Sequence, residues 1–448
     1  MRIFTLSLLS AILISSALHA QVWHPLGSAG FSEGEASSHK ILVIDEVPHV
    51  AYRDAAHGNR ATVMRYNNQE WEAVGEKGFT QEAVGQLGFA HHNGELFLSF
   101  GDAAHENRAS VMRYHDGGWS YLGQPGFSSG TAGIVQLVIE GGTFWVAIRD
   151  GANGNMVTVL KLNGELWEVV GTPGFSTGGS TEVIHLAVDD GIPYVAYRDF
   201  SAGMKASVMK FDGSSWQLLG EPGVTGATYD TYNGLAVHDG VVYLGGWHGA
   251  EAKAAVYTYS GSGWETLGSP GMSAGQATWI SLAITDKGNP YIAYADWGDS
   301  RKAYIMRYDG SDWVMVGEAA SQAEAQFVSL ALSADGSPFV AYRDHARLRR
   351  TTVMTFGEVT GLDSHPVLSS VNVYPNPTRD RFTLTWPGDD QREATIEVVS
   401  TFGQVVFKDK LLPGGEATID LQGHPRGSYF VRLYYDDNVI TKKLLLLK

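Results

Sequence analysis

The chain has 448 residues, of which 44% are apolar, 11% aromatic and 18% charged, with 54 glycines and no cysteine. The lack of cysteine excludes disulfides, thiolate metal sites and cysteine nucleophiles. The formal net charge is −16, and residues 371 to 448 hold ten basic and ten acidic side chains, so the acidic excess lies in the main body, where it would repel the phosphates of nucleic acid.

The first 20 residues read MRIFTLSLLSAILISSALHA, in which Arg2 precedes an apolar run and then small residues up to Ala20. This pattern is typical of a secretory signal peptide and predicts export, with cleavage after Ala20 or Ala17. No later stretch reaches the roughly 18 continuous apolar residues that a spanning helix needs. We therefore expect no transmembrane anchor.

A tryptophan recurs every 48 or 49 residues, at positions 23, 71, 119, 167, 216, 264 and 313. Each unit contains a PGFS-like loop and three apolar segments with period-two alternation, such as VIHLAVDDG, IPYVAYRD and KASVMKFDG, before the next tryptophan. Asn-Gly and Asp-Gly pairs stand where hairpins would turn. Four short strands in each unit of this length predict a propeller blade.

The ends of the repeat predict how the ring closes. The first Trp segment, VWHPLG at 22 to 27, lacks three preceding strands, and the last unit ends at TTVMTF without its Trp strand. We expect the N-terminal strand to pair with the last blade and so remove the free sheet edges. The predicted fold is all-β: a seven-bladed β-propeller at residues 21–358, closed by an N-terminal strand and followed by a small C-terminal β-sandwich.

Residues that recur in most units favour a structural role. Arg-Asp closes the second strand at 53/54, 149/150, 198/199 and 343/344, and Asp recurs there as Asp102 and Asp296. Aspartate at a strand end can accept hydrogen bonds from loop N–H groups. The repeated tryptophans are interpreted as packing residues of the outer strands.

Departures from the repeat are the better candidates for ligand binding. Trp247 and His248 replace Arg-Asp in the fifth unit, and Trp297 follows Asp296 in the sixth. Exposed rings there would suit the apolar faces of sugars, with Asp230, Asp299 and Arg301 bonding to hydroxyls. Packing within the blades is the open alternative for both tryptophans. The loops after the second strands and the PGFS-like loops are expected at one face, the usual ligand face of propellers by analogy.

Histidines also occur in these loops, as His57, His105, His248 and His345. Their scatter over separate units and the lack of H-x-H or H-E-x-x-H spacing favour solvated loop residues over metal ligands. We expect no metal and no cofactor.

Catalysis is the alternative to binding. A polysaccharide lyase would need a base and a group that neutralises a uronate, for which Tyr229, His248 and Arg198 are the candidates. A glycoside hydrolase would need two carboxylates, and the chain offers too many to choose a pair. No P-loop, G-x-S-x-G element or calcium loop occurs, so a binding function takes precedence.

Residues 371 to 448 leave the period and contain a YPNP opening, an STFGQVV turn, a GSYFVR strand and a basic, apolar ending. This order resembles the type A C-terminal sorting domain of the type IX secretion system of Bacteroidetes. The residues that match are Pro375, Asn376, Pro377, Gly403, Gly427, Tyr429, Lys442, Lys443 and Lys448. The resemblance implies a small β-sandwich that guides cargo through the outer membrane, with residues 359–370 as a linker.

The sequence thus predicts a secreted or cell-surface recognition module. Its expected partners are the type IX secretion machinery and a glycan or protein ligand, with glycan slightly favoured.

Overall fold

A computed structural model describes residues 21–178, 183–226, 234–358, 372–386, 394–400, 404–411, 415–435 and 438–447. The chain divides near residue 359 into two compact units. The expected signal peptide and linker lie outside the described residues.

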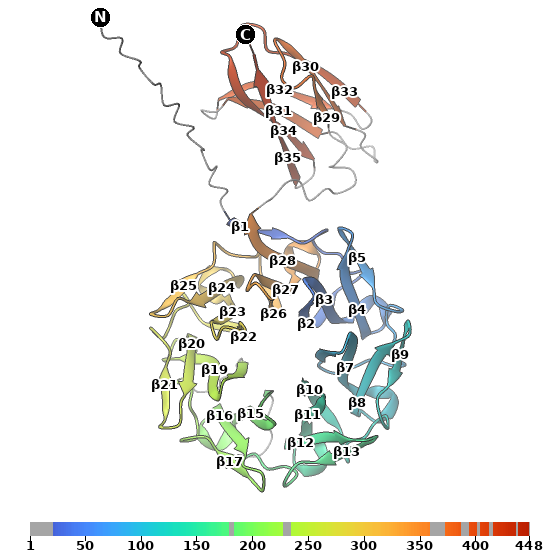
Figure 1. Ribbon diagram of the computed structural model, residues 1–448, viewed down its shortest axis with the longest axis vertical. Helices are drawn as coiled ribbons and strands as arrows, with labels where there is room; N and C mark the ends of the chain where they lie inside the picture. The colour runs from blue at the N-terminus through green and yellow to red at the C-terminus, as the bar shows by residue number, and fades with distance from the viewer. Residues whose placement is uncertain are drawn as a thin grey trace, which may run out of the picture. The chain divides into compact units, whose positions relative to one another are not determined.

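The larger unit is built from four-stranded antiparallel sheets that follow one another around a ring (Figure 1). Sheet 1 comprises β2 (Ala36–Ile44), β3 (Val47–Asp54), β4 (Arg60–Asn67) and β5 (Glu70–Ala73). Sheet 2 comprises β6 (Gly88–His92), β7 (Glu95–Asp102), β8 (Arg108–His115) and β9 (Gly118–Tyr121). Sheet 3 comprises β10 (Ala132–Glu140), β11 (Thr143–Asp150), β12 (Met156–Asn163) and β13 (Leu166–Val169).

The next sheets repeat this order. Sheet 4 comprises β14 (Ile184–Asp189), β15 (Ile192–Asp199), β16 (Lys205–Phe211) and β17 (Trp216–Leu218). Sheet 5 comprises β18 (Gly234–His238), β19 (Val241–His248), β20 (Lys253–Tyr259) and β21 (Trp264–Thr266). Sheet 6 comprises β22 (Ala277–Ile284), β23 (Pro290–Asp296), β24 (Lys302–Tyr308) and β25 (Trp313–Met315).

Sheet 7 joins the two ends of this unit. It comprises β26 (Ala325–Leu332), β27 (Pro338–Asp344), β28 (Arg350–Glu358) and β1 (Gln21–Pro25). In its register Trp23 lies opposite Phe356 and Pro25 opposite Met354. The outer edge of β28 is therefore covered by a strand from the other end of the repeat.

The recurring tryptophans link neighbouring sheets. The indole Nε1–H of Trp119 donates to the carbonyl of Val74 at 2.8 Å, and that of Trp313 to Leu267 at 2.7 Å. Trp23, Trp167, Trp216 and Trp264 make the corresponding bond. Each indole thus buries an apolar ring between sheets while its polar N–H stays satisfied.

A serine or threonine of each PGFS-like loop caps a third strand. Thr80 Oγ1 accepts from the N–H of Ala61 at 3.1 Å, and Ser128 Oγ accepts from Ala109 at 2.9 Å. At the opposite ends of the strands, Asn93-Gly94 and Asp190-Gly191 turn with positive φ at both residues, as the hairpin prediction requires.

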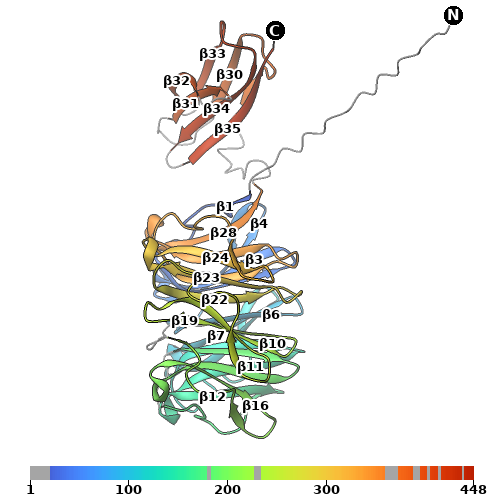
Figure 2. The ribbon, with the colours of Figure 1, turned by 90° about the vertical axis from the view of Figure 1, so that its left-hand side faces the viewer.

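Most second strands run into a short 3-10 helix. These helices are η1 (Ala55–His57), η2 (Ala103–His105), η3 (Gly151–Asn153), η4 (Phe200–Ala202), η5 (Trp297–Asp299) and η6 (His345–Arg347). They lie at the same end of the sheets as the PGFS-like loops, since Gly126 packs on His105 and Gly174 on Asn153. We call this end the loop face. Figure 2 shows the sheets of the ring from the side.

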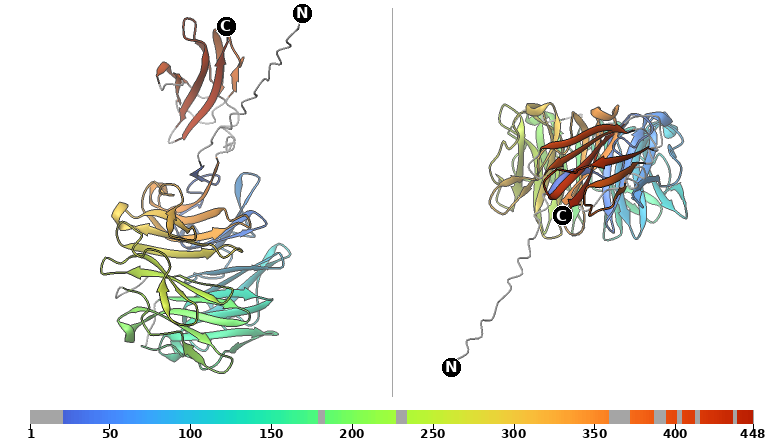
Figure 3. Two further views of the ribbon diagram at one scale, coloured as in Figure 1. Left: turned by 60° about the vertical axis from the view of Figure 1, so that its left-hand side comes forward. Right: turned by 90° about the horizontal axis from the view of Figure 1, so that it is seen from above.

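The smaller unit contains two further antiparallel sheets (Figure 3). One comprises β29 (Asn372–Tyr374), β30 (Arg381–Trp386) and β33 (Gly415–Asp420). The other comprises β32 (Val405–Leu411), β31 (Ala394–Ser400), β34 (Gly427–Tyr435) and β35 (Asn438–Leu446).

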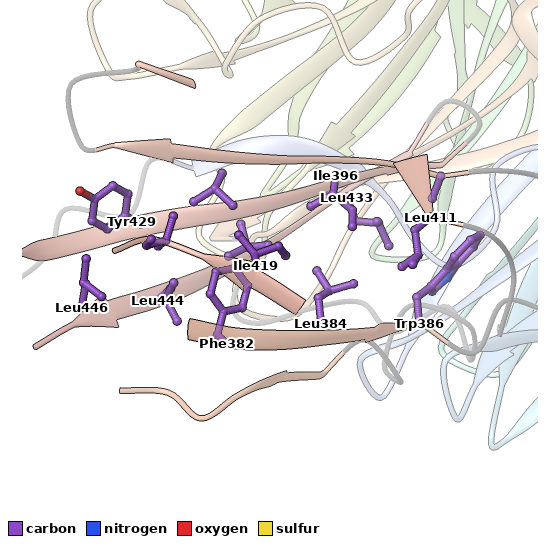
Figure 4. Close-up of a cluster of buried hydrophobic side chains, with 14 residues drawn as sticks. Phe382, Leu384, Trp386, Ile396, Leu411, Ile419, Tyr429, Leu433, Leu444 and Leu446 are labelled. Atoms are coloured by element: carbon purple, nitrogen blue, oxygen red, sulfur yellow. The ribbon is translucent and has the colours of Figure 1, made fainter. Parts of the chain in front are cut away.

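One buried apolar cluster lies between these two sheets. Figure 4 shows Phe382, Leu384 and Trp386 of β30 facing side chains such as Ile396 and Leu433 of the other sheet. The secondary structure of the described residues consists of strands and short 3-10 helices, so the prediction of an all-β chain is confirmed.

Candidate functional site

The strand-end aspartates hold the loops of the loop face. The Asp150 carboxylate is buried and accepts hydrogen bonds from Ala152 N–H at 3.0 Å, Thr158 Oγ1 at 2.7 Å and Asn153 Nδ2 at 2.8 Å. The corresponding Asp54, Asp102, Asp199, Asp296 and Asp344 likewise cap the 3-10 helices that follow them. Since these carboxylates bond to groups of the loops that follow them, the contacts favour a structural role.

Sheet 5 departs from the repeat in packing, and one expectation fails there. The Trp247 side chain is only 5% exposed, its Nε1–H donates to Ala277 O at 2.6 Å, and it belongs to a buried cluster that includes Ile292 and Tyr294. Of the two alternatives left open for Trp247, this burial contradicts an exposed binding ring and supports packing, here between sheets 5 and 6.

His248 occupies the aspartate position of sheet 5. Its Nδ1 lies 3.1 Å from the Tyr257 hydroxyl, which donates to the carbonyl of Trp247 at 3.0 Å and accepts from the N–H of Gly226 at 3.1 Å. The tyrosine hydroxyl thus holds the loop of sheet 5 by hydrogen bonds, as the strand-end aspartate does in the other sheets.

Three predicted residues come together at η5 on sheet 6. The Trp297 ring is 51% exposed, and the Arg301 guanidinium lies 4.3 Å from its centroid. Arg301 also pairs with Glu324 at 2.5 Å. Hydrogen bonds from the Tyr304 hydroxyl, at 2.5 Å, and from Lys302 lower the pKa of Asp299. We call Trp297, Asp299 and Arg301 the rim cluster.

The remaining predicted residues lie apart. Tyr229 and Asp230 fall outside the described residues. His57 and His105 bond to Asp54 and Asp102 at 2.9 Å. Among the residues that the structure describes, no group of histidine and acidic side chains could hold a metal ion.

A cavity of about 300 Å³ opens among the first strands of the sheets. Of the predicted site residues with described side chains, only Arg198 lines it. Its walls are formed by Ser38, His39, Lys40, Gln86, Leu87, Gln136, Val183, Ile184, His185, Arg198, Trp279, Ile280, Phe327 and Val328. These residues lie near the N-terminal ends of the first strands, which are next to the loop face. The cavity therefore lies at that end of the ring.

One repeat position supplies three of the polar lining residues. This position lies on the first strand. It pairs with the residue that stands three places before the last residue of the second strand, and we call it the channel position. From sheet 1 to sheet 7 it holds Lys40, Gly88, Gln136, His185, Gly234, Ser281 and Ser329. The scaffold is repeated while the chemistry at this position varies, which is a signal that the sequence analysis missed.

Basic residues line the cavity: Lys40 from sheet 1, and His185 and Arg198 from sheet 4 across the cavity from it. His185 lies opposite Ala196, so its side chain and that of Arg198, two residues further on, share a face of sheet 4. Burial lowers the pKa of Lys40. Burial and then the charge of Lys40 lower the pKa of His185 to about 3. None of the described lining residues is acidic.

An aromatic wall is formed by Trp279 and Phe327, whose ring centroids are 4.3 Å apart. Each lies in a break of register between the first and second strands, and each has positive φ, 54° and 52°. Left-handed backbone at a bulky side chain costs about 1–2 kcal/mol. The bulges turn the Trp279 and Phe327 side chains toward the cavity.

His39 lies beside the aromatic wall and is 3% exposed. Its ring is 6.4 Å from that of Phe327, and its Nε2 is 3.0 Å from Thr351 Oγ1. Its Nδ1 has no hydrogen-bond partner within the described chain. Burial, with a smaller contribution from Arg343, lowers the pKa of His39 to about 3, so the ring is neutral at pH 7.

In the smaller unit, the YPNP segment is tied to the last strand. The side chain of Asn376 accepts from the N–H of Leu445 at 3.0 Å, and Thr378 exchanges backbone bonds with Leu445 and Leu447. Tyr429 is buried and donates to Pro425 O at 2.6 Å. Gly427 begins β34, Lys442 and Lys443 belong to β35, and Gly403 and Lys448 lie outside the described residues.

No curated protein matches the chain in sequence. Among solved structures, an ulvan lyase bound to a GlcA(1-4)-linked sulfated rhamnose ligand aligns with a TM-score of 0.50 at 12% identity, covering 76% of this chain and 96% of the lyase. A fungal lectin from Aleuria aurantia, described as a six-bladed β-propeller with a fucose recognition mode, aligns with a TM-score of 0.45 at 16% identity, covering 64% and 97%. The first of these likenesses shows a shared fold.

Among the described residues, no helix has the length and apolar character needed to cross a membrane. Residues 372–447 match the family model of the secretion system C-terminal sorting domain. The protein is therefore exported by type IX secretion to the cell surface or the extracellular space.

Proposed function

We propose that the protein is an exported, seven-bladed and closed β-propeller that recognises a glycan in its central cavity. Sheets 1 to 7 would be the blades, and the pairing of β1 with β28 supports the closure. The sorting domain would deliver this module through the type IX machinery, using the motif residues around Asn376 and Tyr429.

The observation that carries the proposal is the pairing of an aromatic wall with hydrogen-bonding groups in one cavity. Trp279 and Phe327 offer apolar rings to the CH face of a sugar, while Gln86 and Gln136 can bond to hydroxyls. A volume of about 300 Å³ lies at the lower end of the usual range for small-molecule pockets. It favours one or two sugar units over a folded protein as the occupant.

The rim cluster would extend this recognition surface. Trp297 exposes half of its ring on the loop face, stacked on Arg301. Glycan chains longer than the cavity would pass over the loop face, where such a ring provides a second stacking platform. We propose this secondary role in place of the central role expected for Trp247.

The test is binding of the mature protein to a glycan array, followed by calorimetry with the best ligand. Trp279→Ala should weaken affinity at least about tenfold, or about 1.4 kcal/mol. Trp297→Ala should weaken only longer oligosaccharides. Unchanged affinity of Trp279→Ala for every bound glycan would contradict the proposed cavity, and a lack of binding to any glycan would contradict the function.

A uronate lyase is the second candidate, because His185 and Arg198 face the same cavity and the ulvan lyase shares the fold. A base would take the C5 proton of a uronate while Arg198 neutralises its carboxylate. The electron pair would form a C4–C5 double bond, and the C4–O bond to the leaving sugar would break, with a proton going to the leaving oxygen. His248 does not line the cavity, so it would not act together with Arg198 on a substrate bound there.

Lyase activity would be detected by the ultraviolet absorbance of unsaturated uronate products. Release of such products by the parent protein, lost in Arg198→Gln, would favour the lyase over simple recognition. A bound polyuronate that keeps its chain length would favour recognition.

A further inference from the structure

We infer that the cavity selects an acidic sugar, one that carries a carboxylate or a sulfate, and that it holds the acid at Lys40 and Arg198 with the sugar ring against Trp279 and Phe327. This inference rests on the proposed glycan-binding function and names the class of glycan.

The charge of the cavity is opposite to that of the protein. The whole chain has a formal net charge of −16, yet the described lining residues include Lys40 and Arg198 and no carboxylate. A cationic concavity in an acidic protein focuses its potential on the cavity itself. Such a field attracts an anion into the cavity while the outer surface repels it.

Lys40 lacks an acidic partner. Its side chain is half-buried, and no carboxylate of the described residues forms an ion pair with it. Arginines nearer the loop face are paired, as Arg343 is with Glu35 at 2.8 Å and Arg301 with Glu324. A desolvated cation gains most from an opposite charge that arrives with a ligand.

His39 adds a buried ring nitrogen that has no hydrogen-bond partner within the described chain. This nitrogen is Nδ1, and the ring borders the cavity beside Phe327. Unsatisfied buried nitrogen atoms are rare in folded proteins. This nitrogen has almost no accessible surface, so the His39 ring would have to turn before a sugar hydroxyl or an ordered water could bond to it.

The aromatic wall and the basic residues together specify the orientation of a bound sugar. Trp279 and Phe327 come from β22 and β26, His185 and Arg198 come from β14 and β15, and Lys40 comes from β2. An acidic sugar has an apolar face and an acid group projecting from its edge, so it can contact the aromatic wall and a basic side chain at once. A neutral sugar would leave Lys40 without a counter-charge.

The test is calorimetric titration of the mature protein with three oligosaccharide sets of matched length: uronate, sulfated and neutral. The acidic sets should bind at least tenfold more tightly than the neutral set, with affinity that falls as salt rises. Lys40→Met should remove most of that preference, and Lys40→Arg should retain it. The matched control is Lys161→Met, which removes a half-buried charge of β12 outside the cavity and should change nothing.

The outcomes separate the two proposals. Equal affinity for neutral and acidic sugars, unaffected by Lys40→Met, would overturn the inference and leave glycan recognition standing. Binding to none of the sets would overturn both. Preference for the uronate or for the sulfated set would each support the inference and would identify the acid group.

Discussion

Lys40 and His185 occupy the same repeat position in sheets 1 and 4, and the charge of Lys40 acts on the His185 ring across the cavity. The repeat therefore brings two residues that are far apart in sequence into one electrostatic environment. It does so because every sheet places its channel position on the inner strand, where the first strands of neighbouring sheets contact each other.

The buried histidines should make the fold sensitive to acid. The folded-state pKa of His39 and His185 is about 3, against about 6.5 in an unfolded chain. The unfolded state binds more protons in this window, so stability is full above pH 6.5 and falls as pH drops toward 3, by at most about 1.4 kcal/mol per pH unit for each histidine. Urea unfolding at several pH values should show a shallower loss for His39→Gln.

The control for this experiment is His91→Gln, at an exposed site on β6, which should keep the parent slope. A His39→Gln variant with the parent slope would contradict the burial of a neutral ring.

Trp247 should be important for stability. Its ring is buried between sheets 5 and 6 and its N–H is satisfied, so Trp247→Ala should cost about 3–5 kcal/mol of unfolding free energy. Trp297→Ala, at an exposed ring, should cost less than about 0.5 kcal/mol. Urea denaturation followed by fluorescence measures both, and equal losses in the two variants would contradict the packing of Trp247.

The strand-end aspartates should be structural. Asp150→Ala leaves three donors without an acceptor, and we expect a loss of about 2–4 kcal/mol. Asp286→Ala, at an exposed turn residue, should be nearly neutral. The melting temperatures of the two variants give the comparison, and a neutral Asp150→Ala would show that loop residues are held by other contacts.

The strand β1 should be required for a monodisperse protein. Removing residues 21–27 uncovers the edge of β28 and deletes the Trp23 bond to Val316 O. An uncovered edge can pair with other chains, so we expect lower stability and self-association in light scattering. A truncated protein that stays monomeric with the parent melting temperature would contradict closure by β1.

The repeated features of the fold could be predicted from the sequence because each rests on local, repeated chemistry. The indole of Trp119 bonds to Val74 in the neighbouring sheet, and the same bond recurs at Trp216 and Trp313. The turn at Asp190-Gly191 has the positive φ values that its residues favour. Such contacts leave a period in the sequence that alignment of the chain with itself reveals.

The cavity could not be predicted in this way, because its residues keep their place in the repeat but change in residue type from unit to unit. The channel position follows the repeat tryptophan by 17 residues at Lys40 and by 18 at His185. Bulges before Lys40 and at Trp279 shift the register and rotate side chains toward the centre. Exposure was the second obstacle, since Trp247, one residue before the end of β19, is 5% exposed, whereas Trp297, one residue after the end of β23, is 51% exposed.

The most direct measurement is a crystal structure of the mature protein with an acidic oligosaccharide. We expect the acid group to lie within hydrogen-bonding distance of Lys40 Nζ or the Arg198 guanidinium, with a sugar ring against Trp279 and Phe327. An oligosaccharide bound only at Trp297 on the loop face, with the cavity empty, would contradict this expectation.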